Sequence, residues 1–138
     1  MIIYYDSAPA IKDKVINRFG KIQRTKLGFT YAVTDSKGNE LAKGINTKID
    51  WQIEGEAYAF LKAIEWIEEN ITEATSIDLY GDNETVVNLH FESKTKAGIY
   101  MKIALDKMHD LSLSDIVVYS RWCEGELNKA DKLSKGKS

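Results

Sequence analysis

LYGDNETVVN, residues 79–88, is the stretch of sequence that decides the fold. The apolar residues of Ile77–Tyr80 predict a short buried strand, and Asp82 follows in the turn after it. Val86 and Val87 then suit a short helix. A strand that is followed by a helix needs a crossover before the next strand, so this stretch predicts parallel strands in an α/β domain.

The N-terminal part of the chain predicts an antiparallel meander of three strands. Ile2–Tyr5 is a β-branched and aromatic run that predicts a buried strand ending at Asp6. Phe29–Thr34 predicts a second strand, and Glu40–Asn46 returns from it through a turn at Asp35–Asn39. Strands that follow one another without a helix between them are expected to pair antiparallel.

Helices dominate the remaining segments. The clearest helix has one apolar stripe, and Asp50 is its expected N-cap. We expect a second amphipathic helix over Ile99–Leu111, a last strand over Ile116–Tyr119 and a closing helix over Leu127–Leu133. The expected apolar stripes consist of Ile53, Ala57, Phe60, Leu61, Ile64 and Ile67 in the first helix, and of Ile99, Ile103, Leu105 and Met108 in the second.

Composition predicts one globular domain over residues 1–138, with 43% apolar and 29% charged residues. The net charge of −2 argues against binding nucleic acid by overall positive charge. Residues 8–27, however, hold six basic residues and one acid, a local charge of +5. The single cysteine, Cys123, excludes an intramolecular disulfide and predicts a reducing, cytoplasmic setting. No apolar run approaches the roughly 18 residues of a membrane span, so we expect a soluble protein with no membrane partner.

The acids are expected to meet at one edge of the sheet. In an open α/β sheet, ligands bind beyond the carboxyl ends of the strands. If the strands before Asp6 and Asp82 are parallel neighbours, both carboxylates project from that edge, and Glu56 on the first helix can complete a cluster. Converging carboxylates repel one another and need a cation to stay ionised at neutral pH. Two Mg²⁺ ions about 4 Å apart among such carboxylates would support phosphodiester cleavage.

Four features make the chain similar to the type 1 ribonuclease H family over Ile2–Ser134. Residues 56–65, EAYAFLKAIE, resemble the Glu-led first helix of that family, and residues 79–88 resemble its strand, acid and helix entry. Residues 130–133, ADKL, resemble the Ala-Asp-x-Leu of the closing helix, and Asp6 matches the acid at the first strand. The resemblance implies a five-stranded mixed sheet, three strands antiparallel and then two parallel, with helices on both faces.

The resemblance also implies an activity and the residues that perform it. It implies hydrolysis of the RNA strand of RNA/DNA hybrids to a 5′ phosphate and a 3′ hydroxyl, with two Mg²⁺ ions or Mn²⁺ in their place. We expect the chain to be a monomer and to bind an RNA/DNA hybrid. The implied catalytic and metal-binding residues are Asp6, Glu56, Asp82 and Asp131, and the expected substrate contacts are Lys12, Lys14, Arg18, Lys21, Arg24, Lys26 and Asn83.

Three departures from the family pattern leave two alternatives open. Ser7 and Ala8 follow Asp6 where the family has Gly-Ser, the loop at residues 121–126 has no histidine, and Asn128 stands three residues before Asp131, one closer than usual. One alternative is a binding module that keeps the fold and binds hybrids without cutting them. The other is a related nuclease with a different substrate.

Overall fold

The computed structural model describes residues 1–16, 19–20, 22–89, 91–92 and 94–136, with the backbone alone for residues 11–16 and 22–26. In chain order, the elements are β1 (Ile2–Ile16), β2 (Ile22–Asp35), β3 (Glu40–Asn46), α1 (Gln52–Asn70), β4 (Thr75–Gly81), α2 (Glu84–Val87), α3 (Lys96–Leu113), β5 (Ile116–Trp122), a 3-10 turn (Gly125–Leu127) and α4 (Asp131–Ser134). No helix in these described ranges combines the length and hydrophobicity that a membrane span requires.

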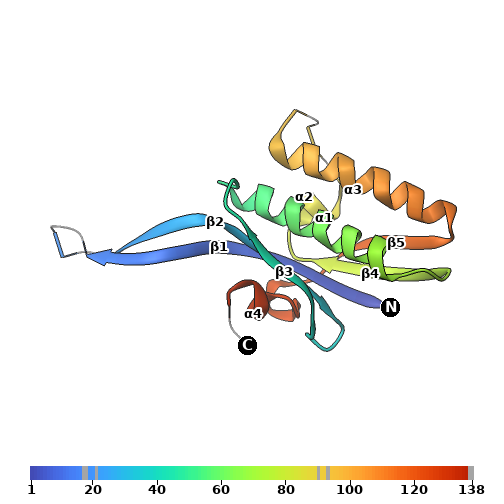
Figure 1. Cartoon of the computed structure of the whole chain (residues 1–138), viewed down its shortest axis with the longest axis horizontal. Helices are drawn as coiled ribbons and strands as arrows, with labels where there is room; N and C mark the ends of the chain where they lie inside the picture. Colours follow the sequence, from blue (N-terminus) through green and yellow to red (C-terminus); the bar gives the residue numbers. More distant parts are fainter. Residues whose placement is uncertain (17–18, 21, 90, 93, 137–138) are drawn as a thin grey trace.

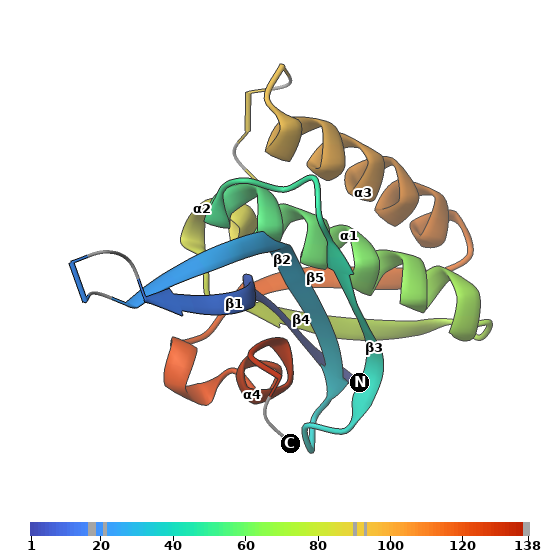
Figure 2. The ribbon, with the colours of Figure 1, turned by 60° about the vertical axis from the view of Figure 1, so that its left-hand side comes forward.

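The five strands form one mixed sheet in the order β3-β2-β1-β4-β5. β3, β2 and β1 pair antiparallel, whereas β1 with β4 and β4 with β5 pair parallel. α1 and α3 lie side by side on one face of the sheet, and α4 lies against the other face (Figures 1 and 2). The expected five-stranded mixed sheet with helices on both faces is therefore confirmed.

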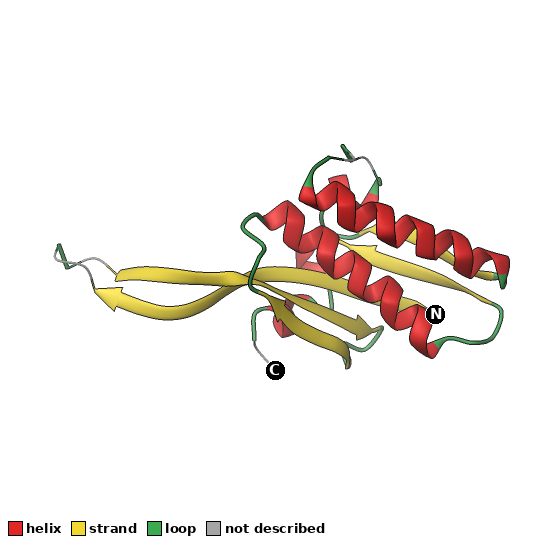
Figure 3. Ribbon diagram, turned by 45° about the horizontal axis from the view of Figure 1, so that its top comes forward, coloured by secondary structure: helices red, strands yellow, loops and turns green. Residues whose placement is uncertain are grey.

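β1 and β2 are much longer than expected, and their far ends form a protruding arm. The prediction that the first strand ends at Asp6 is wrong, because β1 continues to Ile16 and β2 begins at Ile22. The pairing passes through register shifts on either side of Ile11 and ends at Ile16↔Ile22. This hairpin arm, residues 11–16 and 22–26, extends well beyond the helices (Figures 1 and 3). Backbone pairing continues here even though the sequence lacks the alternation that identifies a half-buried strand.

α1 follows its predicted stripe, but its N-terminus differs from the prediction. Ala57, Phe60, Leu61, Ile64 and Ile67 are buried, and Ile53 is half-buried at the border. The N-cap is Trp51, without a side-chain cap bond, rather than Asp50. The Asp50 N–H instead donates to Glu54 Oε1 at 3.3 Å, so an acid within the first turn accepts this hydrogen bond.

α3 packs on a different stripe from the predicted one. Ile99 and Ile103 are 51% and 42% exposed, although they were expected to face the core. The buried side of the helix includes Met101 and Ala104. Residues 97, 101, 104, 108 and 111 are apolar at spacings of three and four, so the sequence contains a second and longer stripe. The small side chains of this second stripe allow α3 to approach α1 closely.

The predicted closing helix over Leu127–Leu133 is interrupted. A 3-10 turn ends at Leu127, and α4 begins only at Asp131. Asn128 between them has an extended backbone, and its Oδ1 accepts a hydrogen bond from the Ala130 N–H at 3.0 Å. This local bond competes with helical hydrogen bonding and separates the two turns.

The core places Tyr5 directly against Gly81. The Tyr5 ring is fully buried and packs edge-on against Phe60, with centroids 5.4 Å apart. A Cβ at Gly81 would overlap the Tyr5 ring, so the absence of a side chain in β4 makes room for it. Gly81 therefore sets how closely β1 and β4 pack just before the two acids that follow them.

We predict that Gly81→Ala lowers the free energy of unfolding by about 1–3 kcal/mol, because an added methyl group forces a buried aromatic ring to move. Gly125→Ala is the matched control, since its Cβ would meet no atom closer than 3.8 Å. Urea denaturation measures both variants. Equal stability of the two would contradict this account of the β1–β4 packing.

Candidate active site

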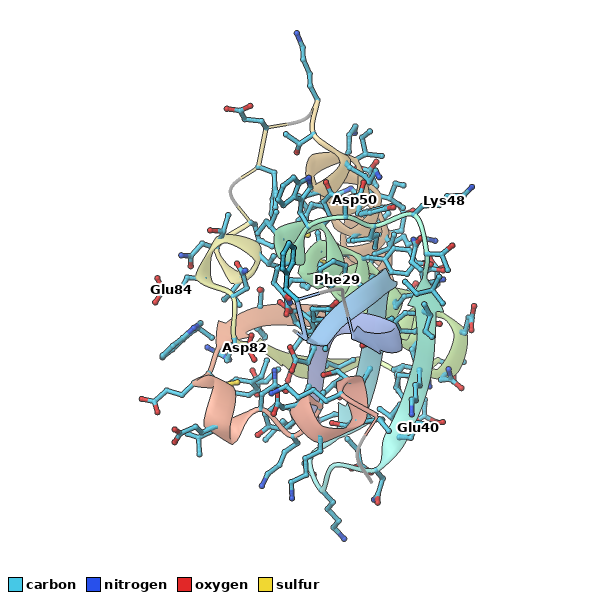
Figure 4. All side chains as sticks on the ribbon, turned by 90° about the vertical axis from the view of Figure 1, so that its left-hand side faces the viewer. Phe29, Glu40, Lys48, Asp50, Asp82 and Glu84 are labelled. Carbon is cyan, nitrogen blue, oxygen red and sulfur yellow. The ribbon has the colours of Figure 1, made fainter. Side chains whose placement is uncertain are left out.

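Three carboxylates from three elements converge in one place. Asp6 belongs to β1, Glu56 to the second turn of α1, and Asp82 follows β4 directly. One oxygen from each lies within 4.8 Å of the other two. The parallel pairing of β1 with β4 ends at Tyr4↔Tyr80, so Asp6 and Asp82 occupy matching positions two residues beyond it. Figure 4 shows Asp82 on the chain between β4 and Glu84 of α2.

Asp6 is held by hydrogen bonds to both carboxylate oxygens. Its Oδ1 accepts from the Ser7 N–H at 2.9 Å, and its Oδ2 accepts from the Ser134 hydroxyl at 3.4 Å. The side chain is only 3% exposed. These bonds fix the orientation of a carboxylate that has little contact with water.

Glu56 has one oxygen bound and the other free. Its Oε1 accepts from Gln52 Nε2 at 2.9 Å, and the same amide donates to the Ser7 carbonyl oxygen at 3.1 Å. Oε2 is buried and has no hydrogen-bond partner, and Glu56 is 2% exposed. Gly55 allows this approach, because a Cβ there would collide with Ser7 Oγ. A buried carboxylate oxygen without a partner is costly in the absence of a ligand.

Asn128 connects Asp82 to β1. Its Nδ2 donates to Asp82 Oδ2 at 3.0 Å and to the Tyr5 carbonyl oxygen at 2.9 Å. The Asn128 side chain is buried, so these bonds are shielded from water. The amide therefore holds the Asp82 carboxylate in position from the C-terminal segment.

Asp131 lies at the border of the three-acid group rather than within it. It is half-exposed, and its carboxylate pairs with the Lys135 ammonium at 3.1 Å. The charge of Asp131 contributes to the raised pKa of Asp82, and the Ser134 hydroxyl lies within hydrogen-bond distance of both Asp6 Oδ2 and the Asp131 carbonyl oxygen. The structure therefore brings all four predicted acids to one region, with Asp131 on the solvent side.

Burial and mutual repulsion raise the pKa values of the three clustered acids. Burial is the largest cause for Asp6, followed by the charge of Asp82, and together they raise the pKa of Asp6 to about 7. The pKa of Glu56 lies well above its ordinary value because of burial and then the charge of Asp6. Burial also raises the pKa of Asp82, although the hydrogen bond from Asn128 opposes this. The site is thus poorly suited to carry its full negative charge without a cation.

The donor set fits a hard divalent cation. Mg²⁺ and Mn²⁺ bind carboxylate oxygens, and Asp6, Glu56 and Asp82 each present one within a small volume. Glu56 Oε2, which accepts no hydrogen bond, is available to coordinate such an ion. Cysteine or histidine ligands, which zinc prefers, are absent from this group of described residues.

The structure gives the location of only some of the predicted substrate-binding residues, and their role in binding stays a prediction. Asn83 acts as the N-cap of α2, where its Oδ1 accepts from the Val86 N–H at 3.2 Å. Lys12, Lys14, Arg24 and Lys26 lie on the strands of the hairpin arm. Arg18 and Lys21 fall outside the described residues.

Sequence reasoning missed the roles of the residues that support the acids. Gln52 precedes Glu56 by four residues, and Lys135 follows Asp131 by four. Side chains four residues apart on a helix are neighbours, so this spacing was a usable signal. Asn128 was noted only as a departure from the family pattern, and its bond to Asp82 joins distant segments that spacing does not reveal. The same is true of the bond from Ser134 to Asp6.

Comparisons with solved structures agree on the architecture. The similar structures include an RNase H1 from the halophilic archaeon Halobacterium salinarum, with 15% identity, a TM-score of 0.58, and coverage of 97% of this chain and 93% of that one. The N-terminal RNase H domain of a Mycobacterium tuberculosis protein, fused to maltose-binding protein, shows 12% identity, a TM-score of 0.59 and coverage of 99% and 98%. The chain has the ribonuclease H fold.

A third similar structure is LC11-RNase H1 in complex with an RNA/DNA hybrid, with 18% identity, a TM-score of 0.57, and coverage of 99% of this chain and 94% of that one. No protein-family model matches the chain, and no curated protein matches it by sequence. At these identities, the likeness to solved structures establishes the ribonuclease H fold, whereas the chemistry has to be argued from the site itself.

We predict that the metal-free protein loses stability as the pH rises from about 4 to above 7. In that window the unfolded chain has already ionised its acids, whereas folded Asp6, with a pKa of about 7, still holds its proton. Glu56→Gln removes one charge and should be more stable than the wild type near pH 8 by about 1–3 kcal/mol, because a tenfold change in proton affinity corresponds to about 1.4 kcal/mol.

Urea denaturation with chelator at several pH values measures this effect. Near pH 4.5 the two proteins should be nearly equal, and Mg²⁺ should stabilise only the wild type near pH 8. Glu69→Gln, an exposed acid on the same helix, is the control and should follow the wild type. If the free energy of unfolding changed with pH in the same way for the wild type and Glu56→Gln, charge repulsion among the three acids would not destabilise the fold.

Proposed function

We propose that the chain is a metal-dependent endonuclease that hydrolyses the RNA strand of RNA/DNA hybrids. The observation that carries this proposal is the buried group of Asp6, Glu56 and Asp82, with the unpartnered Oε2 of Glu56 inside it. The ribonuclease H fold supports the proposal, as does a similar structure that was solved with an RNA/DNA hybrid bound. Asp131 completes the proposed catalytic set from α4.

In this proposal, the acids hold divalent ions, with Mg²⁺ as the physiological ion and Mn²⁺ as a substitute. Bound ions activate a water molecule and stabilise the oxygen that leaves phosphorus. Asp6, Glu56 and Asp82 would hold one ion, and Asp131 would contribute to holding a second. In hydrolysis the water oxygen bonds to phosphorus, the bond from phosphorus to the 3′ oxygen breaks, and that oxygen takes up a proton.

The surrounding residues keep the acids in place and limit the access of water. Asn128 and Gln52 hold the carboxylates of Asp82 and Glu56 through direct hydrogen bonds. Ser134 does the same for Asp6. Positioned ligands lose little freedom when the ion and the phosphate bind, and this lowers the cost of assembling the reactive complex. Selection of a hybrid would depend on 2′-hydroxyl contacts and on helix shape.

Asp82→Asn should reduce metal-dependent cleavage of the hybrid's RNA strand by about 100-fold or more, because each factor of ten corresponds to about 1.4 kcal/mol of lost transition-state stabilisation. Glu84→Gln is the matched control, since this exposed acid lies two residues away and should retain activity. The assay uses labelled RNA/DNA hybrid, double-stranded RNA, duplex DNA and single strands, with Mg²⁺, Mn²⁺ or chelator.

The same assay separates the alternatives. Metal-independent binding of the hybrid without any cutting would support a non-catalytic binding module. Metal-dependent cutting of another substrate in preference to the hybrid would support a related nuclease. Equal cutting by the wild type and Asp82→Asn would reject the proposed site.

We also propose that the hairpin arm contacts the phosphate backbone away from the acids. The arm carries most of the local charge of +5, and Lys14 and Arg24 are direct partners in the pairing of its two strands. The arm is the continuation of β1, the strand that holds Asp6, and of its neighbour β2, so the arm and Asp6 belong to one sheet. Contacts between basic side chains and phosphates supply affinity that does not depend on sequence.

The double variant Lys14→Gln/Arg24→Gln should weaken hybrid binding and make it less sensitive to salt. Each lost phosphate contact lowers the slope of log affinity against log salt by about 1, so the slope should fall by about 2. Lys102→Gln/Lys107→Gln on α3 is the control and should leave the slope unchanged. Fluorescence anisotropy with Ca²⁺ in place of Mg²⁺ measures binding. An unchanged slope in the arm variant would remove the arm from the substrate-binding surface.

A further inference from the structure

Asp131 differs from the other predicted acids because it is paired with a basic side chain. The Lys135 Nζ lies 3.1 Å from Asp131 Oδ1 and 3.2 Å from Oδ2, so the ammonium contacts both carboxylate oxygens. Asp6, Glu56 and Asp82 have no such ion pair among the residues that the structure describes. The border of the site thus already contains one positive charge.

The backbone beside Lys135 is anchored to the site. The Ser134 hydroxyl donates to the Asp131 carbonyl oxygen at 2.8 Å and to Asp6 Oδ2 at 3.4 Å. The Thr30 hydroxyl of β2 donates to the Ser134 carbonyl oxygen. Lys135, the residue that caps the C-terminus of α4, is therefore presented at a fixed point of the backbone beside the acids, with its side chain 53% exposed.

The charge of Lys135 interacts with Asp131 and, over a longer distance, with Asp6 and Asp82. Its hydrogen bond with Asp131 raises the pKa of Lys135, and the charges of Asp6 and Asp82 raise it further. Burial raises the pKa of Asp82, and Lys135 opposes that rise. The side chains of Lys135 and Asp131 are 53% and 35% exposed, and exposed pairs of this kind contribute about 0–1 kcal/mol. An ion pair this weak can be displaced by a divalent ion.

We propose that Lys135 is a built-in cation that neutralises Asp131 where a second divalent ion would bind, so the site holds one ion firmly and a second only when it displaces Lys135. This inference rests on the proposed metal site. It assigns Lys135 as a positioning residue that sets the relative affinity of the two ions, rather than as a ligand of either ion.

The test is a titration of the intact protein with Mn²⁺, in which free Mn²⁺ is followed by electron paramagnetic resonance near pH 8 and at low ionic strength. Lys135→Met should leave the affinity for the first Mn²⁺ ion within a factor of about 2 and raise the affinity for the second by about 3- to 5-fold, the effect expected from losing an exposed ion pair. Lys132→Met is the matched control, because this exposed lysine lies on the same turn without an ion pair to Asp131 among the described residues.

Two results would overturn the inference. One is an unchanged second step in Lys135→Met, and the other is a change equal to that of Lys132→Met, which would indicate a general charge effect. Loss of the first Mn²⁺ binding step in Glu56→Gln would show that the metal site exists. If Lys135→Met then left the affinity for the second Mn²⁺ ion unchanged, that result would reject only the role of Lys135. Absence of any Mn²⁺ binding would reject the metal site and this inference together. Thermal unfolding checks that each variant is folded.

Discussion

The repulsion among three carboxylates that are largely removed from water is the constraint on which the rest of the site depends. Asp6 and Glu56 are buried, so water screens their charges poorly, and the folded chain tolerates them only by binding protons or a cation. The hydrogen bonds of the site do not remove this repulsion, because they leave Oε2 of Glu56 without a partner. The acidic group therefore lowers the stability of the folded chain unless a proton or a cation neutralises it.

The architecture holds this unfavourable group together through features that lie outside it. Parallel pairing brings the ends of β1 and β4 to the same edge, and Gly81 allows them to pack around Tyr5. Gly55 brings α1 close enough for Glu56 to reach that edge. The pairing of the sheet and the burial of the apolar core beneath it thus offset the electrostatic destabilisation by the acids. α1 and α3 contribute many of the buried side chains of that core.

The sequence predicted the features that depend on local pattern. The stripe of α1 followed from periodicity, and the position of Asp82 followed from the end of β4. Asp6 was placed at the correct edge of the sheet although β1 continues through it to Ile16. Three features depend on contacts between distant segments and were therefore predicted wrongly or missed. Two apolar stripes exist on α3, and packing against α1 selects the one that lacks Ile99. The arm forms by pairing of two polar strands, and Asn128 acquires its role only when the C-terminal segment reaches Asp82.

The register shifts on either side of Ile11 lie between the acids and the tip of the hairpin arm. Such irregularities locally increase the twist of a strand pair and bend it. The direction in which the described strands of the arm leave the domain is therefore set around Ile11, a few residues from Asp6, rather than at the acids themselves. Substitutions near Ile11 that change the twist would reorient the arm while leaving the hydrogen bonds that hold Asp6 and Asp82 in place.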